Sequence, residues 1–120
     1  MSIEDPISRY EICVGLNDAD ARSQKYSKET YEKIIFNVCK GLEISYSISK
    51  IDGVYVHEDG TPIKEKSLCI TLLGINDQQA EEIAKDFCVI FNQESVLVLK
   101  YECKYSFIRE KIITNTSDVS

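Results

Sequence analysis

Two short segments of this 120-residue chain repeat each other and constrain the whole fold. Gly-Leu-Asn-Asp at 15–18 and Gly-Ile-Asn-Asp at 74–77 each follow an alternating apolar run and each precede a run with helical spacing. The repetition indicates two related β-α-β units. A chain of this length forms one domain. We expect that domain to span 1–120, with its core at about 8–108 and a flexible tail at 110–120.

The first half of the chain predicts a strand, a helix and a second strand. Residues 9–16 alternate between apolar and other side chains, which is typical of a half-buried strand. Ser27 is placed as an N-cap, and the apolar residues after it recur at helical spacing until Gly41, where the helix should end. The segment 45–56 is extended and β-branched, and Gly53 within it predicts a β-bulge.

The second half of the chain predicts a hairpin, a helix and a last strand. Asp-Gly-Thr-Pro at 59–62 is typical of a turn, and it leads into a return strand at 64–73. Asn76 is placed as an N-cap with Gln79 three residues later, an amide form of the capping box. A final strand is expected at 95–107, with its odd positions facing the core.

The element order predicts an α+β fold. With right-handed crossovers, β-α-β-β-α-β gives the ferredoxin-like arrangement, a four-stranded antiparallel sheet with two helices on one face. The other face is bare, and we expect it to carry Cys13, Cys69, Thr71, Leu73, Val96 and Val98, beside Glu11, Lys100 and Glu102. So many apolar side chains predict self-association through this face or through the helices, as a dimer or higher oligomer.

The net charge excludes one class of partner. Fourteen Lys and Arg against twenty Asp and Glu give a net charge of −6. A DNA or RNA polymer requires a locally basic groove, which no run in this chain supplies. The start of the chain lacks a basic and then apolar leader, and no apolar stretch approaches the roughly 20 residues that cross a bilayer. We therefore expect a cytoplasmic protein that binds no membrane.

The cysteines predict neither disulfides nor a metal. Five scattered cysteines without C-x-x-C spacing, in a protein expected in a reducing compartment, predict free thiols. His57 is the only histidine, and a structural zinc site needs four converging Cys or His ligands.

No sequence pattern predicts a reaction. The chain has no phosphate-cradling Gly-rich loop, no H-E-x-x-H and no G-x-S-x-G. His57 is beside the hairpin turn, where a general base is poorly preorganised. Glu58 and Asp59 fit a solvated turn better than a carboxylate pair. We expect a protein that is not an enzyme and that holds no cofactor.

One loop is a candidate binding site. Between Asp18 and the first helix the chain has an insertion at 19–26 that the second half lacks, and it brings Arg22 and Lys25 to a strand-to-helix edge. A helix N-terminus there favours an anion. A solvated connector is the alternative.

Two further groups of residues are candidate ligands. At the end of the second helix, Phe91 is a core candidate, whereas Asn92 and Gln93 have amides that suit a base edge or a ribose. C-capping and turn formation are their alternative role. Arg109 and Lys111 follow the last strand, and Arg binds phosphate in a bidentate manner. A solubilising strand end is equally consistent with these two cations.

The chain resembles a group of small proteins carried by phages and mobile elements of low-GC Gram-positive bacteria. The shared motifs are a Gly-Leu-Asn-Asp strand end at 15–18, a Tyr-x-His-Glu-Asp-Gly hairpin at 55–60 and an Asn-Gln-Glu-Ser junction at 92–95, and the likeness covers about 8–108. That group is similar to the phage anti-Thoeris sponge proteins. The resemblance implies an oligomer that binds cyclic ADP-ribose signals, or in some members cyclic oligonucleotides, without cleaving them.

The resemblance also implies roles for particular residues. A ligand held between protomers needs Arg109 for phosphate, Phe91 for adenine and Asn92 for ribose or base, with Arg22 and Lys25 as further candidates. The expected function is sequestration of a cyclic nucleotide immune signal in the host bacterial cytoplasm, which blocks anti-phage defence. Two alternatives remain, namely an inhibitor that binds a host protein through the open sheet face, and a small dimeric ferredoxin-like enzyme.

Overall fold

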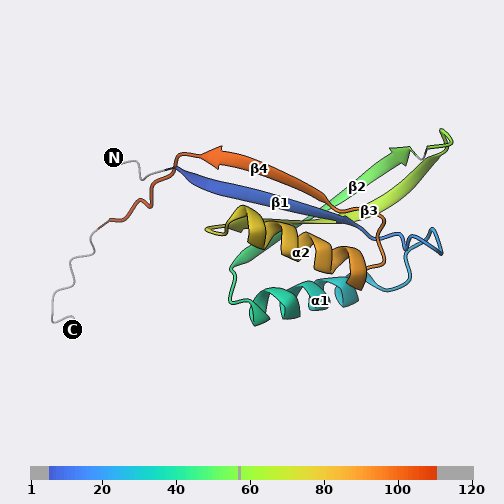
Figure 1. The fold of residues 1–120 in the computed structure, drawn as a ribbon, viewed down its shortest axis with the longest axis horizontal. Helices are drawn as coiled ribbons and strands as arrows, with labels where there is room; N and C mark the ends of the chain where they lie inside the picture. Colours follow the sequence, from blue (N-terminus) through green and yellow to red (C-terminus); the bar gives the residue numbers. More distant parts are fainter. Residues whose placement is uncertain (1–5, 57, 111–120) are drawn as a thin grey trace.

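The fold is a single sheet covered on one face by two helices (Figure 1). The computed structural model describes residues 6–56 and 58–110. Its elements are β1 (Ile7–Gly15), α1 (Lys28–Gly41), β2 (Tyr46–Val56), β3 (Pro62–Leu73), α2 (Asp77–Ile90) and β4 (Leu97–Cys103). All neighbouring strands are antiparallel, in the order β2-β3-β1-β4, which confirms the predicted ferredoxin-like fold. In the described part of the chain, neither helix has the length and apolar content to span a bilayer.

The helix boundaries follow the predicted caps. The side chain of Ser27 accepts a hydrogen bond from the backbone N–H of Thr30, and α1 ends at Gly41. Before α2, the Asn76 side chain accepts from the Gln79 N–H at 2.8 Å, and the Gln79 side chain accepts from the Asn76 N–H at 2.9 Å. These bonds satisfy backbone donors that the first turn of a helix leaves free.

The core lies between the sheet and the helices. It is built from alternate residues of β1 and β3 and from one side of each helix. Its main members are Tyr10, Ile12, Val14, Leu68, Ile70, Leu72, Tyr31, Ile35, Cys39, Ala80, Ile83, Phe87 and Phe91. This burial fixes which face of each strand is covered.

The predicted orientation of the last strand is wrong. Lys100 of β4 is directly opposite Tyr10 of β1, and Val98 is opposite Ile12, so the even positions face the helices. A lysine is tolerated there because its Nζ lies 2.9 Å from Oδ1 of Asp77, at the start of α2. Tyr10 donates a hydrogen bond to the same carboxylate. The strand also ends at Cys103 rather than near position 107.

The open face is therefore more apolar than expected. Leu97, Leu99 and Tyr101 of β4 lie opposite Cys13, Glu11 and Arg9, and they replace the expected Val96, Val98, Lys100 and Glu102. The expected residues of β1 and β3 are on this face, because Glu11 is opposite Thr71 and Cys13 is opposite Cys69.

The hairpin between β2 and β3 is confirmed, but the bulge at Gly53 is not. The register runs without interruption from Tyr46 opposite Leu72 to Val56 opposite Pro62. His57 and residues 111–120, on which the expected general base and flexible tail fall, are outside the described residues.

The expectation of five free thiols is wrong for one pair. Cys13 and Cys69 are directly opposite on β1 and β3, and they form a disulfide across the open face. The sequence spacing conceals this pair because the two cysteines are 56 residues apart. Cys39, Cys88 and Cys103 are free.

The disulfide predicts a stability that depends on reductant. Closing a long loop in the unfolded chain typically contributes about 2–4 kcal/mol. We expect dithiothreitol to lower the melting temperature of the wild-type protein and to leave a Cys13→Ser/Cys69→Ser variant unchanged. Thiol titration of the unfolded, unreduced protein should give the three thiols of Cys39, Cys88 and Cys103. Five titratable thiols would contradict the cross-link.

Candidate functional site

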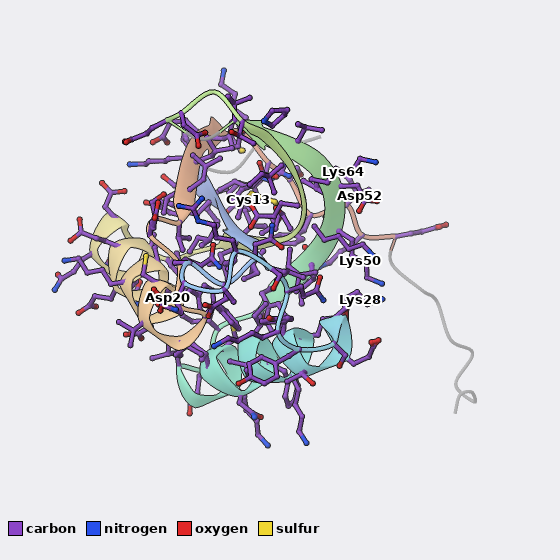
Figure 2. The ribbon with its side chains drawn as sticks, turned by 90° about the vertical axis from the view of Figure 1, so that its right-hand side faces the viewer. Cys13, Asp20, Lys28, Lys50, Asp52 and Lys64 are labelled. Carbon is purple, nitrogen blue, oxygen red and sulfur yellow. A yellow bond between two sulfur atoms is a disulfide. The ribbon has the colours of Figure 1, made fainter. Side chains whose placement is uncertain are left out.

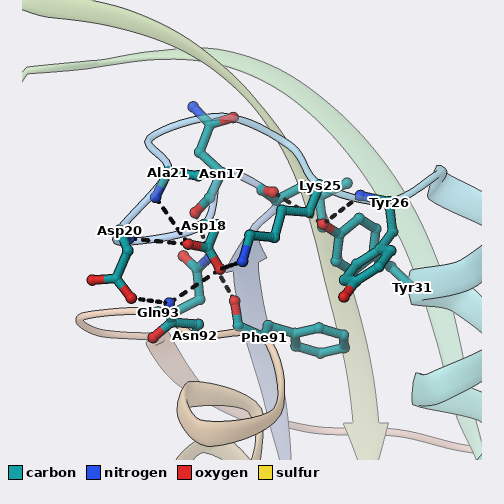
Figure 3. Close-up of polar contacts among 11 residues, drawn as sticks. Asn17, Asp18, Asp20, Ala21, Lys25, Tyr26, Tyr31, Phe91, Asn92 and Gln93 are labelled. Atoms are coloured by element: carbon teal, nitrogen blue, oxygen red, sulfur yellow. Dashed lines mark hydrogen bonds and ion pairs between the residues drawn. The ribbon is translucent and has the colours of Figure 1, made fainter.

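A group of polar side chains joins two loops at one end of the sheet (Figure 3). We call it the loop junction and define it as Asn17, Asp18, Lys25, Asn92 and Gln93. The first three belong to the loop between β1 and α1, and the last two to the connection between α2 and β4.

Asp18 is the centre of the loop junction. The residue is 6% exposed, and its Oδ2 accepts hydrogen bonds from the backbone N–H groups of Asp20 and Ala21, both at 3.0 Å. Its Oδ1 accepts from Nδ2 of Asn92 at 3.1 Å and lies 3.6 Å from Nζ of Lys25. A carboxylate is stable in a buried position when its oxygens are satisfied in this way.

These partners favour the ionised form of Asp18. The backbone N–H of Ala21 and the Asn92 amide, followed by the N–H of Asp20 and the charge of Lys25, hold the pKa of this carboxyl below its ordinary value of 3.8. Burial acts in the opposite direction and is outweighed. The group is therefore a fixed negative charge at neutral pH.

Asn92 and Gln93 hold the loop in place. Asn92 has φ +48°, a left-handed conformation that Asn adopts more readily than most residues, and its carbonyl accepts from the Ala19 N–H at 2.8 Å. Gln93 donates through Nε2 to the carbonyl of Asn17 at 2.6 Å. The two amides that the sequence offered as ligands are thus engaged within the chain.

Glu65 is a second carboxylate of the site, and no sequence motif points to it. Its Oε2 accepts from the backbone N–H of Asn17 at 3.0 Å. Its carboxylate lies over Gly15, where a Cβ atom would be 2.5 Å from Cδ and both oxygens. Glycine has no Cβ, so at position 15 it leaves room for the Glu65 carboxylate. A glycine at the end of a strand is the one sequence signal of such a close approach.

Three hollows surround the loop junction. The largest has a volume of about 630 Å³ and lies between the loop and the β2–β3 hairpin. It is lined by Asn17, Gln24, Asp52, Gly53, Val54, Lys64, Glu65 and Lys66. A hollow of about 50 Å³ shares Asn17 and Glu65 with it, and one of about 200 Å³ lies beside Asp18, Tyr26 and Tyr31.

The structure brings together some of the predicted ligand residues. Arg22 and Gln93 line the smallest hollow, whereas Lys25, Phe91 and Asn92 line the hollow of about 200 Å³. Phe91 is 5% exposed and packs its ring against Tyr31 and Phe87, so its faces are occupied by the core.

The predicted phosphate ligand Arg109 lies elsewhere. It is exposed in the segment that follows β4, and Cys103 at the end of β4 is opposite Ile7 at the start of β1. The loop junction follows the other end of β1, so one chain does not bring Arg109 to it (Figure 1). Lys111 is outside the described residues.

The comparisons with known proteins identify the fold and no family. No protein family and no curated protein sequence matches the chain. Among solved structures, a phage SAM lyase in complex with S-methyl-5′-thioadenosine is 24% identical, with a TM-score of 0.67 over 94% of this chain and 98% of that chain. The apo form of a phage SAM lyase gives a TM-score of 0.66 at the same identity and coverage.

A second kind of neighbour binds nucleotides. A nitrogen regulatory PII-like protein from Thiomonas intermedia, bound to ADP, AMP and acetate, is 11% identical, with a TM-score of 0.53 over 89% of this chain and 94% of that chain. The lyases are phage proteins, as are the small proteins that the sequence resembles. The neighbours named here do not include an anti-Thoeris protein.

The expectation that the chain is not an enzyme is corrected by this likeness. The phage SAM lyase, whose fold matches over almost the whole chain, is an enzyme. The expectation depended on the absence of motifs for familiar acid–base and nucleophilic chemistry, and such an absence does not exclude an enzyme. In the residues that the structure describes, no group of three or more His, Cys, Asp or Glu side chains is placed to hold a metal ion.

The buried carboxylate predicts an acid-sensitive fold. Because the pKa of Asp18 is lower in the folded protein than in the unfolded chain, its contribution to stability is present above pH 3.8 and is lost as the pH falls through the folded-state pKa. We expect Asp18→Asn to lower the melting temperature at pH 7 and to reduce its fall between pH 5 and about pH 2. Asp86→Asn, at an exposed position of α2, is the control. Equal acid dependence in the Asp18→Asn variant and the wild type would contradict this role.

Proposed function

We propose that this chain is a phage-type lyase that cleaves S-adenosylmethionine and releases S-methyl-5′-thioadenosine. The observation that carries the proposal is Glu65, which lines a hollow of about 630 Å³ and whose carboxylate is held over Gly15. The likeness of the fold to a phage SAM lyase over 94% of the chain supports it.

The reaction needs no proton transfer. Loss of the aminobutyrate arm from the sulfonium sulfur leaves S-methyl-5′-thioadenosine. The carboxylate of the arm attacks its own γ-carbon as the carbon–sulfur bond breaks, the electron pair stays on sulfur, and the arm leaves as a five-membered lactone. No water enters and no proton moves. The protein therefore acts by holding the attacking oxygen and the carbon in line.

The large hollow suits such a substrate. Ligand pockets typically have volumes of about 300–1,000 Å³, and this hollow is within that range. Glu65 supplies a negative charge for the sulfonium cation. One of its oxygens is already held by the Asn17 N–H, which keeps the carboxylate in one place.

Two substitutions test the role of Glu65. In the wild type we expect S-adenosylmethionine to be converted to S-methyl-5′-thioadenosine, measured by chromatography and mass spectrometry. Glu65→Gln should lower kcat/KM by at least about tenfold, as expected when a charged contact is lost. Gly15→Ala should do the same, because its methyl group displaces the carboxylate.

The control for Gly15→Ala is Gly41→Ala, since a Cβ at position 41 meets nothing within 4 Å. Melting temperatures of all variants separate loss of activity from loss of the fold. The proposal is wrong if the wild type releases no S-methyl-5′-thioadenosine, or if both site variants keep full activity. Tight binding of a cyclic ADP-ribose isomer without cleavage of S-adenosylmethionine would favour the sequestering role instead.

We also propose that the open face of the sheet binds a second copy of the chain. Leu73, Leu97 and Tyr101 are 52%, 55% and 44% exposed there, beside Leu99. Exposed apolar side chains gathered on one face, here around the Arg9–Glu11 ion pair, indicate an interaction site. The sheet face is favoured over the helices because three strands contribute to it.

A charge on the open face tests this association. Leu97→Glu should convert an oligomer into a monomer with an unchanged circular dichroism spectrum, because a carboxylate would be desolvated in the interface. Val89→Glu, at an 82% exposed position of α2, is the matched control and should leave the oligomer intact. Light scattering after size-exclusion chromatography gives the mass. A monomeric wild type, or dissociation by Val89→Glu alone, would contradict the assignment.

A further inference from the structure

On the helix-facing side of the β2–β3 hairpin, the side chains change from apolar to charged along the strands. Near α1 and α2, Tyr46 and Ile48 pack against the core. Farther along the hairpin the same face carries Asp52, Lys64 and Lys66, because side chains alternate and every second residue returns to one face. The hairpin projects past both helices there (Figure 1), and the uncovered stretch carries these charged residues together with the exposed Val54.

The register places the three charged side chains together. Asp52 is directly opposite Lys66, and the neighbouring same-face pair is Val54 opposite Lys64. All four residues line the hollow of about 630 Å³ that contains Glu65. The three charges therefore lie on the helix side of the hairpin, and Glu65, between Lys64 and Lys66 in the sequence, lines the hollow although its side chain leaves β3 on the opposite face.

The three side chains are free to bind a ligand. The side chains of Asp52, Lys64 and Lys66 form no hydrogen bond or ion pair with any residue in 6–56 or 58–110. Lys50 lies on the same face and is labelled next to Asp52 in Figure 2. Unlike the three side chains above, it has an ion-pair partner. It lies 4.0 Å from Glu32, which partly balances its charge.

The charges match one kind of molecule. Asp52 and Glu65 give two negative charges, and Lys64 and Lys66 give two positive ones. A sulfonium amino acid carries a sulfonium, an ammonium and a carboxylate. A phosphate-rich nucleotide would instead require an excess of cations, which this wall lacks.

We infer that the outer part of the β2–β3 hairpin recognises the amino-acid arm of the substrate, with Lys64 and Lys66 binding its carboxylate and Asp52 binding its ammonium group. This inference rests on the proposed function. It makes the hollow selective for an adenosyl sulfonium that carries a complete amino acid. Binding through one carboxylate oxygen leaves the other free for attack on the γ-carbon.

Substrate analogues that lack one group test each contact. Decarboxylated S-adenosylmethionine keeps the sulfonium and the ammonium, whereas S-methyl-5′-thioadenosine lacks the whole arm. A Lys64→Ala/Lys66→Ala variant should weaken binding of S-adenosylmethionine by at least about tenfold, the effect of a lost charged contact. Its affinity for decarboxylated S-adenosylmethionine should stay within about twofold of the wild type. Isothermal titration calorimetry measures the affinities for decarboxylated S-adenosylmethionine and S-methyl-5′-thioadenosine, which lack the attacking carboxylate. For S-adenosylmethionine, which the enzyme consumes, the KM of cleavage is compared instead.

Asp52→Asn should weaken binding of both ligands that carry the arm. Its affinity for S-methyl-5′-thioadenosine should stay within about twofold of the wild type. Lys33→Ala, an exposed lysine of α1, is the control for loss of positive charge and should change none of the affinities. The inference is overturned if the lysine variant binds S-adenosylmethionine as the wild type does, or loses all three ligands equally. Failure of the proposed function is seen separately, as a wild type that neither cleaves S-adenosylmethionine nor binds its thioether product.

Discussion

The buried carboxylate of Asp18 is the interaction on which the site depends. Its bond to Asn92 joins segments that are 74 residues apart, and its bonds to Asp20 and Ala21 fold the loop back on itself. The loop in turn carries Asn17, whose N–H holds Glu65. Because a buried carboxylate without partners is costly, the loop keeps this conformation and so keeps the wall of the large hollow in place.

Local patterns predict the fold because caps, turns and alternation are local. Ser27 and Asn76 begin the helices as expected, and the repeated Gly-x-Asn-Asp segments end β1 and β3. The same repeat does not predict the site. Asp77 begins α2 at the surface, whereas Asp18 is buried, and the difference arises only because the connection after α2 packs against the first loop.

Long-range relations explain what the sequence did not predict. The orientation of β4 depends on the partner that Lys100 finds on α2. Glu65 depends on the absence of a side chain at Gly15, which is 50 residues earlier and on another strand. The orientation of β4 has no local signal, and Gly15 indicates a close approach without indicating that Glu65 makes it. The net charge of −6 disfavours nucleic-acid polymers. It is equally suited to a small substrate with a net positive charge, which an acidic surface attracts.

The disulfide between Cys13 and Cys69 fixes the register of β1 against β3. If β1 slipped by two residues against β3, every apolar side chain would keep its face, since side chains alternate with a period of two. Hydrophobic burial alone therefore distinguishes the two pairings poorly. The slip would nevertheless move Gly15 away from Glu65. A residue with a side chain would then lie beneath the Glu65 carboxylate. The bond between Cys13 and Cys69, two positions from Gly15 and from its partner Ser67, allows a single pairing. In this chain a covalent bond thus fixes the alignment of β1 with β3 that brings Gly15 beneath Glu65.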